Sequence, residues 1–203
     1  KKSENDYLDK ERIVFITRKY SDHLMYSVNF IDEKNEPETL NKASAIWTRE
    51  KKDISAEQYE EFYKQIGAGF DKPLLTLHNK VEGTLSYINL LFIPGSRPFD
   101  LFQMDVKSKI KLYSNRVLIT DDSESILPRW LRFVKGIVDT SDVDLNVSRE
   151  MLQHNVTLNK ISKALKKRVI NELKKLKDKD TDKYQSFWNE FGIVLKEGIY
   201  EDF

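Results

Sequence analysis

The chain has 203 residues, and its 34 Lys and Arg against 33 Asp and Glu give a formal net charge of +1. This length is enough for one domain with a sizeable core, and the near balance of charge gives no general reason to expect a nucleic acid or a membrane as partner. The absence of cysteine excludes disulfides and Cys-ligated metal sites and fits a reducing, cytoplasmic compartment.

The first third of the chain contains several short apolar runs. The run 13–16 is compatible with a strand or a buried helix, because four residues cannot separate the two by period. Strands are predicted at 26–31 and 43–47, with a loop at 32–38 between them. The clearest helix is predicted at 53–66, where Ser55 and Gln58 have capping-box spacing and apolar residues recur at helical intervals.

The residue pattern in the middle of the chain is typical of β-strands. Strands are predicted at 74–79, 84–93, 110–114 and 116–119, with a loop marked by Pro94, Gly95 and Pro98. We therefore expect an α/β block over residues 1–125.

The pattern changes to helical spacing after residue 125. Leu127, Trp130, Leu131, Val134 and Val138 follow at such steps, and Pro128 suits a first helical turn. From residue 148 onward almost everything is predicted to be helix. We therefore expect residues 126–203 to form a helical extension. Because the first residue is Lys1 and not Met, we also expect the chain to be a piece of a longer protein.

Most catalytic signatures are absent. His23, His78 and His154 lie far apart in the sequence, and none has a second ligand at helical spacing, so we expect no metal site. The chain also lacks a nucleophile elbow, a P-loop and a dinucleotide-binding glycine motif.

Residues 159–183 hold ten Lys and Arg against four acidic residues, a local net charge of +6. This segment is either a stripe that faces RNA or another anionic surface, or the solvated side of an amphipathic helix. We prefer the second interpretation, because no aromatic residues are interleaved with the charges for base stacking.

Residues 144–153 are the most specific segment. Asn146 or Ser148 can cap a following helix, which places Arg149 in the first turn and Gln153 one turn later. An arginine there is unfavourable against the helix dipole unless an anion lies nearby, and a helix N-terminus with a guanidinium suits a phosphate. A surface arginine paired with Glu150 or Asp144 is the equally weighted alternative.

The chain resembles the middle domain of the heat-shock protein 90 chaperones over essentially its whole length. The matching motifs run in the same order and at similar spacing. They are YSDH at 20–23, IWTR at 46–49, EQYEEFY at 57–63, VEG at 81–83, LFIP at 91–94, RPFDLF at 97–102, IKLY at 110–113, LPRWLRFVKG at 127–136, LNVSREMLQ at 145–153 and LKEG at 195–198. The short loop at 32–38 and the lack of an acidic linker are closer to the bacterial members than to the eukaryotic cytosolic ones.

The resemblance implies a three-layer α/β/α sandwich with a mixed or mostly antiparallel sheet, followed by helices. It also implies a cytoplasmic, homodimeric parent chaperone in which an N-terminal domain binds ATP and Mg and a C-terminal domain dimerises. By resemblance, Arg149 is the catalytic-loop arginine that reaches the γ-phosphate, Gln153 is its partner, and Trp47 belongs to a contact site for client proteins. The alternative for Trp47 is a half-buried aromatic at a strand end. The chain alone should not hydrolyse ATP.

Three positions depart from or qualify the family pattern. Leu118 stands where many members have Phe, which should weaken aromatic packing against the catalytic loop. Asp144 replaces a usual proline, which should loosen that loop. At 13–16 we follow the family and expect a helix.

Two other functions remain as hypotheses. The chain could be a non-catalytic binding module that uses the basic helix for RNA or anionic surfaces, or a spacer between domains. Neither needs Arg149.

Overall fold

The computed structural model describes residues 9–31, 36–67, 71–103, 106, 109–121, 126–144, 152 and 155–201. The elements in chain order are α1 (Lys10–Tyr20), β1 (Asn29–Ile31), β2 (Pro37–Thr39), the 3-10 turns η2 (Ile46–Thr48) and η3 (Lys51–Asp53), α2 (Ala56–Gln65), β3 (Leu75–Val81), β4 (Tyr87–Ile93), β5 (Lys109–Ser114), β6 (Val117–Thr120), η4 (Arg129–Leu131), β7 (Lys135–Thr140), α4 (Val156–Lys179) and α5 (Thr181–Glu201).

Five strands form the central sheet in the order β3-β4-β7-β5-β6. All neighbours are antiparallel except β5 and β7, which are parallel, so the sheet is mixed. Strand β4 is apolar almost throughout because both of its faces are covered: Leu90 and Phe92 face one core, Leu91 and Ile93 the other.

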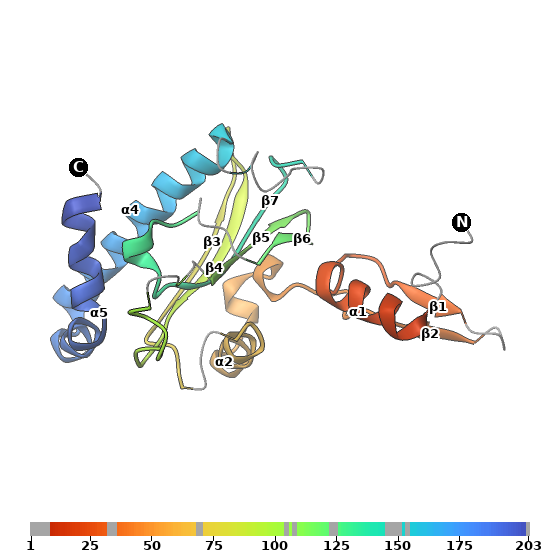
Figure 1. The fold of residues 1–203 in the computed structure, drawn as a ribbon, viewed down its shortest axis with the longest axis horizontal. Helices are drawn as coiled ribbons and strands as arrows, with labels where there is room; N and C mark the ends of the chain where they lie inside the picture. The colour runs from red at the N-terminus through yellow and green to blue at the C-terminus, as the bar shows by residue number, and fades with distance from the viewer. Residues whose placement is uncertain are drawn as a thin grey trace.

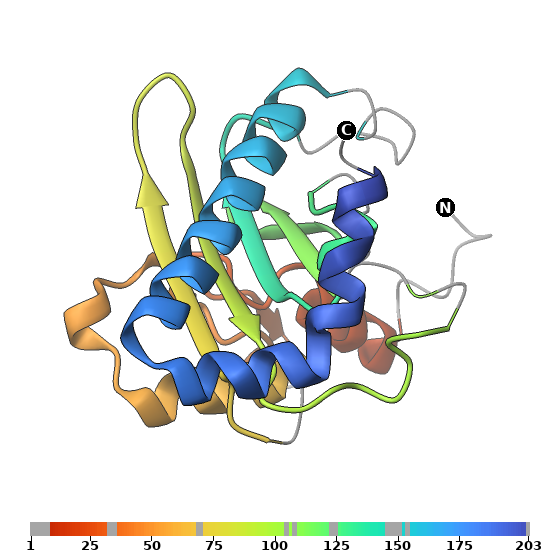
Figure 2. The same ribbon diagram turned by 90° about the vertical axis from the view of Figure 1, so that its left-hand side faces the viewer.

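Helices cover the two faces of the sheet. Helix α2 and turn η2 pack on one face through Trp47, Phe62 and Tyr63. Helices α4 and α5 pack on the other, and Figure 2 shows them crossing in front of the strands. The predicted three-layer α/β/α sandwich is therefore confirmed, with the C-terminal helices as its third layer. We call this unit the block.

Helix α1 and the hairpin of β1 and β2 project from one end of the block (Figure 1). We call them the arm. Residues 13–16 are helical, as the resemblance implied, and the Asp9 side chain caps the helix. The arm exposes Phe15, Met25, Tyr26 and Ile31. Strand β2 begins at Pro37, inside the region predicted as a loop.

Two predicted elements are wrong. Residues 43–47 do not form a strand, because the chain enters turn η2 at Ile46. Residues 127–138 do not form a helix: they form turn η4 and then β7, which lies in the middle of the sheet. The sheet therefore continues past residue 125, where we placed the end of the α/β block. Every residue of β7 is buried, so its sequence lacks the alternation that marks a half-exposed strand.

The remaining elements agree with the sequence to within a few residues. The predicted capping box of α2 is present, with the Gln58 amide donating to Ser55 Oγ at 3.3 Å and the Ser55 amide to Gln58 Oε1 at 3.1 Å. No helix in the described part of the chain has the length and apolar character that a membrane crossing requires.

Candidate functional site

Arg149 and Gln153 lie outside the described residues, but residues on both sides of 145–151, the stretch that carries Arg149, are described, and Gln153 directly follows the described Leu152. On the upstream side Val143 is 2% exposed and belongs to the core beneath α4. Its carbonyl oxygen accepts a buried hydrogen bond from Ser114 Oγ at 2.6 Å. This bond ties the chain directly before the segment to the end of β5.

The turn that leads from β7 to Val143 is held by a second set of hydrogen bonds. Thr140 Oγ1 donates to the Ser86 carbonyl oxygen at 2.7 Å, and the Ser86 amide donates to Asp142 Oδ2 at 2.9 Å. The Asp142 amide donates to Thr140 Oγ1 at 3.1 Å. The end of β7 is thereby fixed to the connection between β3 and β4. Asp144 is exposed.

On the downstream side Leu152 is 4% exposed and packs into the same core as Val143. The Asn155 amide donates to the Leu152 carbonyl oxygen at 3.3 Å, and Asn155 Oδ1 caps α4 by accepting from the Leu158 amide at 3.0 Å. The chain is therefore anchored in one core on both sides of residues 145–151.

Trp47 is part of the core on the opposite face of the sheet. Its ring is 1% exposed, and Nε1 donates to Asp139 Oδ2 at 2.8 Å. The ring also packs edge-on against His23, with centroids 4.6 Å apart, and at a tilt of 43° against Tyr113, with centroids 5.0 Å apart. The alternative interpretation, a half-buried aromatic at a strand end, is corrected by these contacts, because the ring is fully buried and belongs to turn η2. In this conformation the surface at this position is made by the neighbours of Trp47 and not by its indole ring.

We expect Trp47→Phe to lower the free energy of unfolding by about 1–3 kcal/mol, because the buried Asp139 carboxylate loses a donor. Asp139 keeps only the Arg116 amide, at 3.2 Å, among its described partners. Urea unfolding followed by circular dichroism measures the change. Trp130→Phe is the matched control, since the buried Trp130 Nε1 has no hydrogen-bond partner among the described residues. Equal losses in the two variants would show that ring volume, and not the Asp139 bond, sets the cost.

His78 connects three elements beneath Trp47. Its Nε2 lies 2.8 Å from the Trp47 carbonyl oxygen, and its Nδ1 lies 2.7 Å from the Tyr59 hydroxyl. Because a carbonyl only accepts, Nε2 carries the proton and Nδ1 accepts from Tyr59 in the neutral ring. Burial lowers the pKa of His78, against the opposing hydrogen bond to Trp47. Within the described residues, no group of three or more His, Asp or Glu could hold a metal ion.

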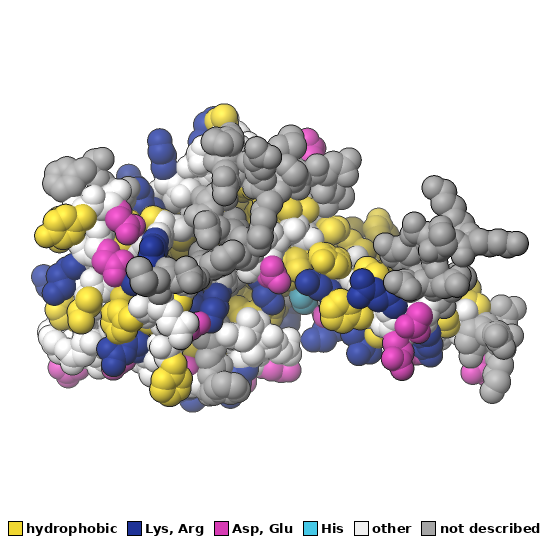
Figure 3. All heavy atoms as spheres, in the orientation of Figure 1, with side chains coloured by type: hydrophobic (Ala, Val, Ile, Leu, Met, Phe, Trp, Pro, Cys, Tyr) yellow, Lys and Arg dark blue, Asp and Glu magenta, His cyan; other side chains and the backbone are white. Residues whose placement is uncertain are grey.

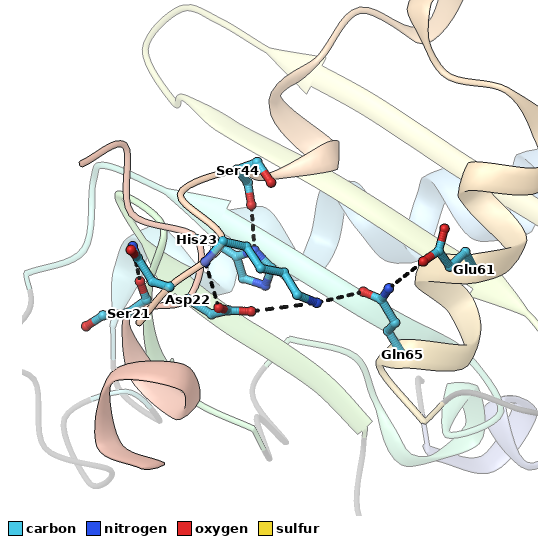
Figure 4. A network of polar contacts seen from close by, with 8 residues as sticks. Ser21, Asp22, His23, Ser44, Glu61 and Gln65 are labelled. Atoms are coloured by element: carbon cyan, nitrogen blue, oxygen red, sulfur yellow. Dashed lines mark hydrogen bonds and ion pairs between the residues drawn. The ribbon is translucent and has the colours of Figure 1, made fainter. Parts of the chain in front are cut away.

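His23 lies where the arm meets the block, and burial lowers its pKa as well. Its Nδ1 donates to the Ser44 carbonyl oxygen at 2.7 Å. Figure 4 shows this contact beside a polar chain that runs to α2, where Gln65 Nε2 donates to Glu61 Oε1 at 3.0 Å. A groove of about 320 Å³ lies here, lined by His23, Lys42, Ser44, Ile46, Arg49, Gln58, Glu61, Phe62 and Gln65.

We expect the free energy of unfolding to fall as the pH is lowered from 7 to 5. The folded-state pKa values of His78 and His23 lie below the ordinary 6.5, so the unfolded chain binds more protons in this range. Urea unfolding at pH 7, 6 and 5 measures the slope. His78→Gln and His23→Gln should each make it shallower. A stability that is constant or rises on acidification would contradict this assignment.

The sequence did not reveal a group of buried charges at the other end of the sheet. Arg132 is 4% exposed, and its guanidinium contacts both carboxylate oxygens of Glu197 at 2.5 and 2.8 Å. Arg132 Nε also donates to the Leu101 carbonyl oxygen at 2.8 Å. Lys135 is 2% exposed, and burial together with the charge of Lys109 lowers its pKa to about 8. Leu101 and Glu197 are 31 and 65 positions from Arg132, whereas Lys135 Nζ donates to the nearby Arg132 carbonyl oxygen at 3.2 Å. The only sequence signal was the presence of two cations inside an apolar run.

Helix α4 is amphipathic, as we preferred from the sequence. Its buried residues recur at helical spacing and pack on the sheet. Some of its cations have partners: Arg168 donates to Asn79 Oδ1 at 2.7 Å and pairs with Glu172, which also pairs with Lys175. Leu118, the departure from the family pattern, is buried beside Tyr113 in the core under α2.

Comparisons with known proteins agree on one family. The family model described as Hsp90 protein matches residues 30–203. The chain is 52% identical over 203 residues to the chaperone protein HtpG of Paramagnetospirillum magneticum, a match that covers 100% of this chain and 33% of that protein. It is 54% identical over 198 residues to the HtpG of Rhodospirillum rubrum, covering 98% and 32%. The chain thus spans about a third of the length of the curated relatives it matches.

A solved structure extends the comparison to the fold. The middle domain of a Plasmodium falciparum heat shock protein is similar with a TM-score of 0.68 and 35% sequence identity. The match covers 78% of this chain and 61% of that one.

Proposed function

Since this chain belongs to the heat-shock protein 90 family and has the fold of its middle domain, we propose that it acts as the middle domain of an ATP-dependent molecular chaperone. In this proposal ATP and Mg are bound by a separate N-terminal domain, and a C-terminal domain holds two copies together. The parent is a cytoplasmic ATPase, and this chain alone does not hydrolyse ATP.

Arg149 is proposed to stabilise the charge that develops on the γ-phosphate. A guanidinium presents a planar set of donors that can contact two phosphate oxygens at once, which a lysine ammonium cannot do. Phosphoryl transfer depends almost entirely on such positioning and charge stabilisation. Gln153 is proposed to support the arginine in this role.

The observation that carries the proposal is the anchoring on both sides of residues 145–151. Val143 and Leu152 are buried in one core, and the Ser114 hydroxyl fixes the carbonyl of Val143. Two attachment points in one core favour the presentation of Arg149 from a fixed part of the domain, because positioning a group in advance lowers the entropy cost of the reaction. In this proposal the arginine comes from one domain and the nucleotide is held by another. Other phosphoryl-transfer systems also use an arginine that is supplied in trans.

Client proteins are proposed to contact the surface above Trp47. Because the indole is buried, Trp47 would act as a positioning residue that holds turn η2 against the sheet. Ile46 and Arg49 flank it and line the groove beside α2, and they would make the contacts. Such a surface offers apolar and charged groups together, which suits partly folded chains.

The test is steady-state ATP turnover by the full-length parent carrying Arg149→Ala, with ATP affinity measured on the same protein. Slow turnover at unchanged affinity supports the proposal. Turnover equal to wild type would reject the catalytic assignment and favour a spacer or a pure binding module.

A further inference from the structure

A small hollow lies at the joint between the arm and the block. Its volume is about 240 Å³. Its wall is formed by α1, by the chain between α1 and β1 at Asp22, by the chain that leads from β2 to the block at Lys42, and by α2, β5 and the end of β6. In Figure 3 several dark blue Lys and Arg side chains lie in the narrow region between the block and the arm. The charged groups that line the hollow are Arg18, Lys19, Lys42, Lys111, Asp22 and Asp121.

One of the two carboxylates is already used by one of the cations. Asp22 Oδ1 accepts from the Lys42 amide at 3.0 Å, and Asp22 Oδ2 lies 3.9 Å from Lys42 Nζ. Gln65 Oε1 accepts from Lys42 Nζ at 3.5 Å, and Figure 4 shows Asp22 and Gln65 at the two ends of this set of contacts. Among the described residues that line the hollow, Asp121 is the carboxylate that remains for the other three cations.

Lys111 is the least exposed of the four cations. Burial lowers its pKa, and the attraction of Asp121 opposes this only in part. Neither Lys111 nor Arg18 has a carboxylate within 4.0 Å among the described residues. A half-buried ammonium without a contacting anion is costly, because part of its hydration is lost and not replaced.

We propose that this hollow binds a phosphate-class oxyanion between Lys111 of β5 and Arg18 of α1. The volume exceeds the roughly 30 Å³ of a water several times over, so phosphate or pyrophosphate fits with part of its hydration. The multiple charges of such an ion suit cations that converge from several elements, with the guanidinium contacting two oxygens and the ammonium one. Because the cations belong to the arm and to the block, a bound ion fixes the arm relative to the sheet.

Isothermal titration of the 203-residue chain with inorganic phosphate and, separately, with pyrophosphate at low ionic strength tests the site. Saturable binding is expected, with the more highly charged pyrophosphate binding more tightly. Lys111→Gln should weaken binding about fivefold through loss of a charge-assisted contact. Asp121→Asn should strengthen it about threefold, because the competing carboxylate is removed. Circular dichroism checks that each variant is folded.

Lys174→Gln is the matched control, because it removes the same charge from an exposed position on α4. It should leave the affinity unchanged. Absence of saturation in the wild-type chain would overturn the proposal, and so would equal weakening by Lys111→Gln and Lys174→Gln, which would indicate a general effect of net charge. ATP turnover by the Arg149 variant is a separate measurement, so the two proposals can fail independently.

Discussion

The full-length parent carrying Arg149→Ala is expected to hydrolyse ATP about 10²-fold more slowly than wild type, which is the usual cost of removing a donor that stabilises transition-state charge. ATP affinity should stay nearly the same, because in our proposal the nucleotide is held by the N-terminal domain and meets Arg149 only when the domains dock. A loss in turnover without a loss in affinity is typical of an interaction made only in the transition state.

Arg149→Lys separates charge from geometry in this experiment. It keeps the positive charge but loses the planar fork, so it should restore only a small part of the turnover. Gln153→Ala should cause a smaller loss than Arg149→Ala, because its proposed role is to support the arginine.

Measurements of stability and ATP affinity distinguish a loss of folding or of binding from a loss of catalysis. If Arg149→Ala lowered the unfolding midpoint as well as turnover, misfolding would explain the loss. A parent that binds ATP less tightly after Arg149→Ala, with unchanged turnover at saturation, would place the arginine in ground-state binding and contradict the proposal. Thermal unfolding and nucleotide titration of the same preparation distinguish these outcomes.

The sequence predicted best where the determinants are local. Helix α2 is the clearest example, because Ser55, Gln58 and an apolar stripe all lie within the helix or directly before it. The same holds for the apolar face of α4, whose buried residues recur at steps of three and four. For residues 13–16 the pattern alone did not decide, and the resemblance did.

The prediction of secondary structure from the sequence failed where a segment is enclosed by the rest of the fold. Residues 129–131 form a single 3-10 turn, and β7 follows with both faces buried. One short turn followed by a fully buried strand places large residues at three- and four-residue steps by coincidence, and the resulting spacing resembles that of a helix. Arg132 and Lys135, which lie in this segment, are buried as well: Arg132 Nε donates to the Leu101 carbonyl oxygen, 31 positions away, and Lys135 Nζ donates to the Arg132 carbonyl oxygen.

The candidate site shows the same division. Arg149 and Gln153 were identified by motif and stay predictions, because they lie outside the described residues. Trp47 was placed on a strand end from neighbouring residues alone. Its buried indole donates a hydrogen bond to Asp139, which is 92 positions away, and no local pattern contains that pair.

Gly136→Ala is expected to lower the free energy of unfolding by about 3–5 kcal/mol, the sum of backbone strain and overpacking. Gly136 lies in β7 opposite Leu91 and has φ +137°, which side-chain-bearing residues rarely adopt. An added Cβ would lie 2.2 Å from the Leu90 carbonyl oxygen and 2.8 Å from Leu91 Cα, both in the neighbouring strand backbone. Backbone cannot move aside as a flexible side chain can, so β4 and β7 would have to separate at the centre of the sheet.

Gly83→Ala isolates the steric part of this cost. Gly83 has a similar φ of +149°, but an added Cβ would meet nothing within 4 Å, so only the conformational cost of about 1–2 kcal/mol applies. Urea unfolding of the two variants should therefore give clearly different midpoints, with Gly136→Ala losing a large share of a typical stability of about 5–15 kcal/mol. Equal losses would mean that the sheet relaxes around the added methyl group. In that case strand β7 would tolerate separation from β4, and the core that anchors Val143 and Leu152 would not depend on the close approach of these two strands.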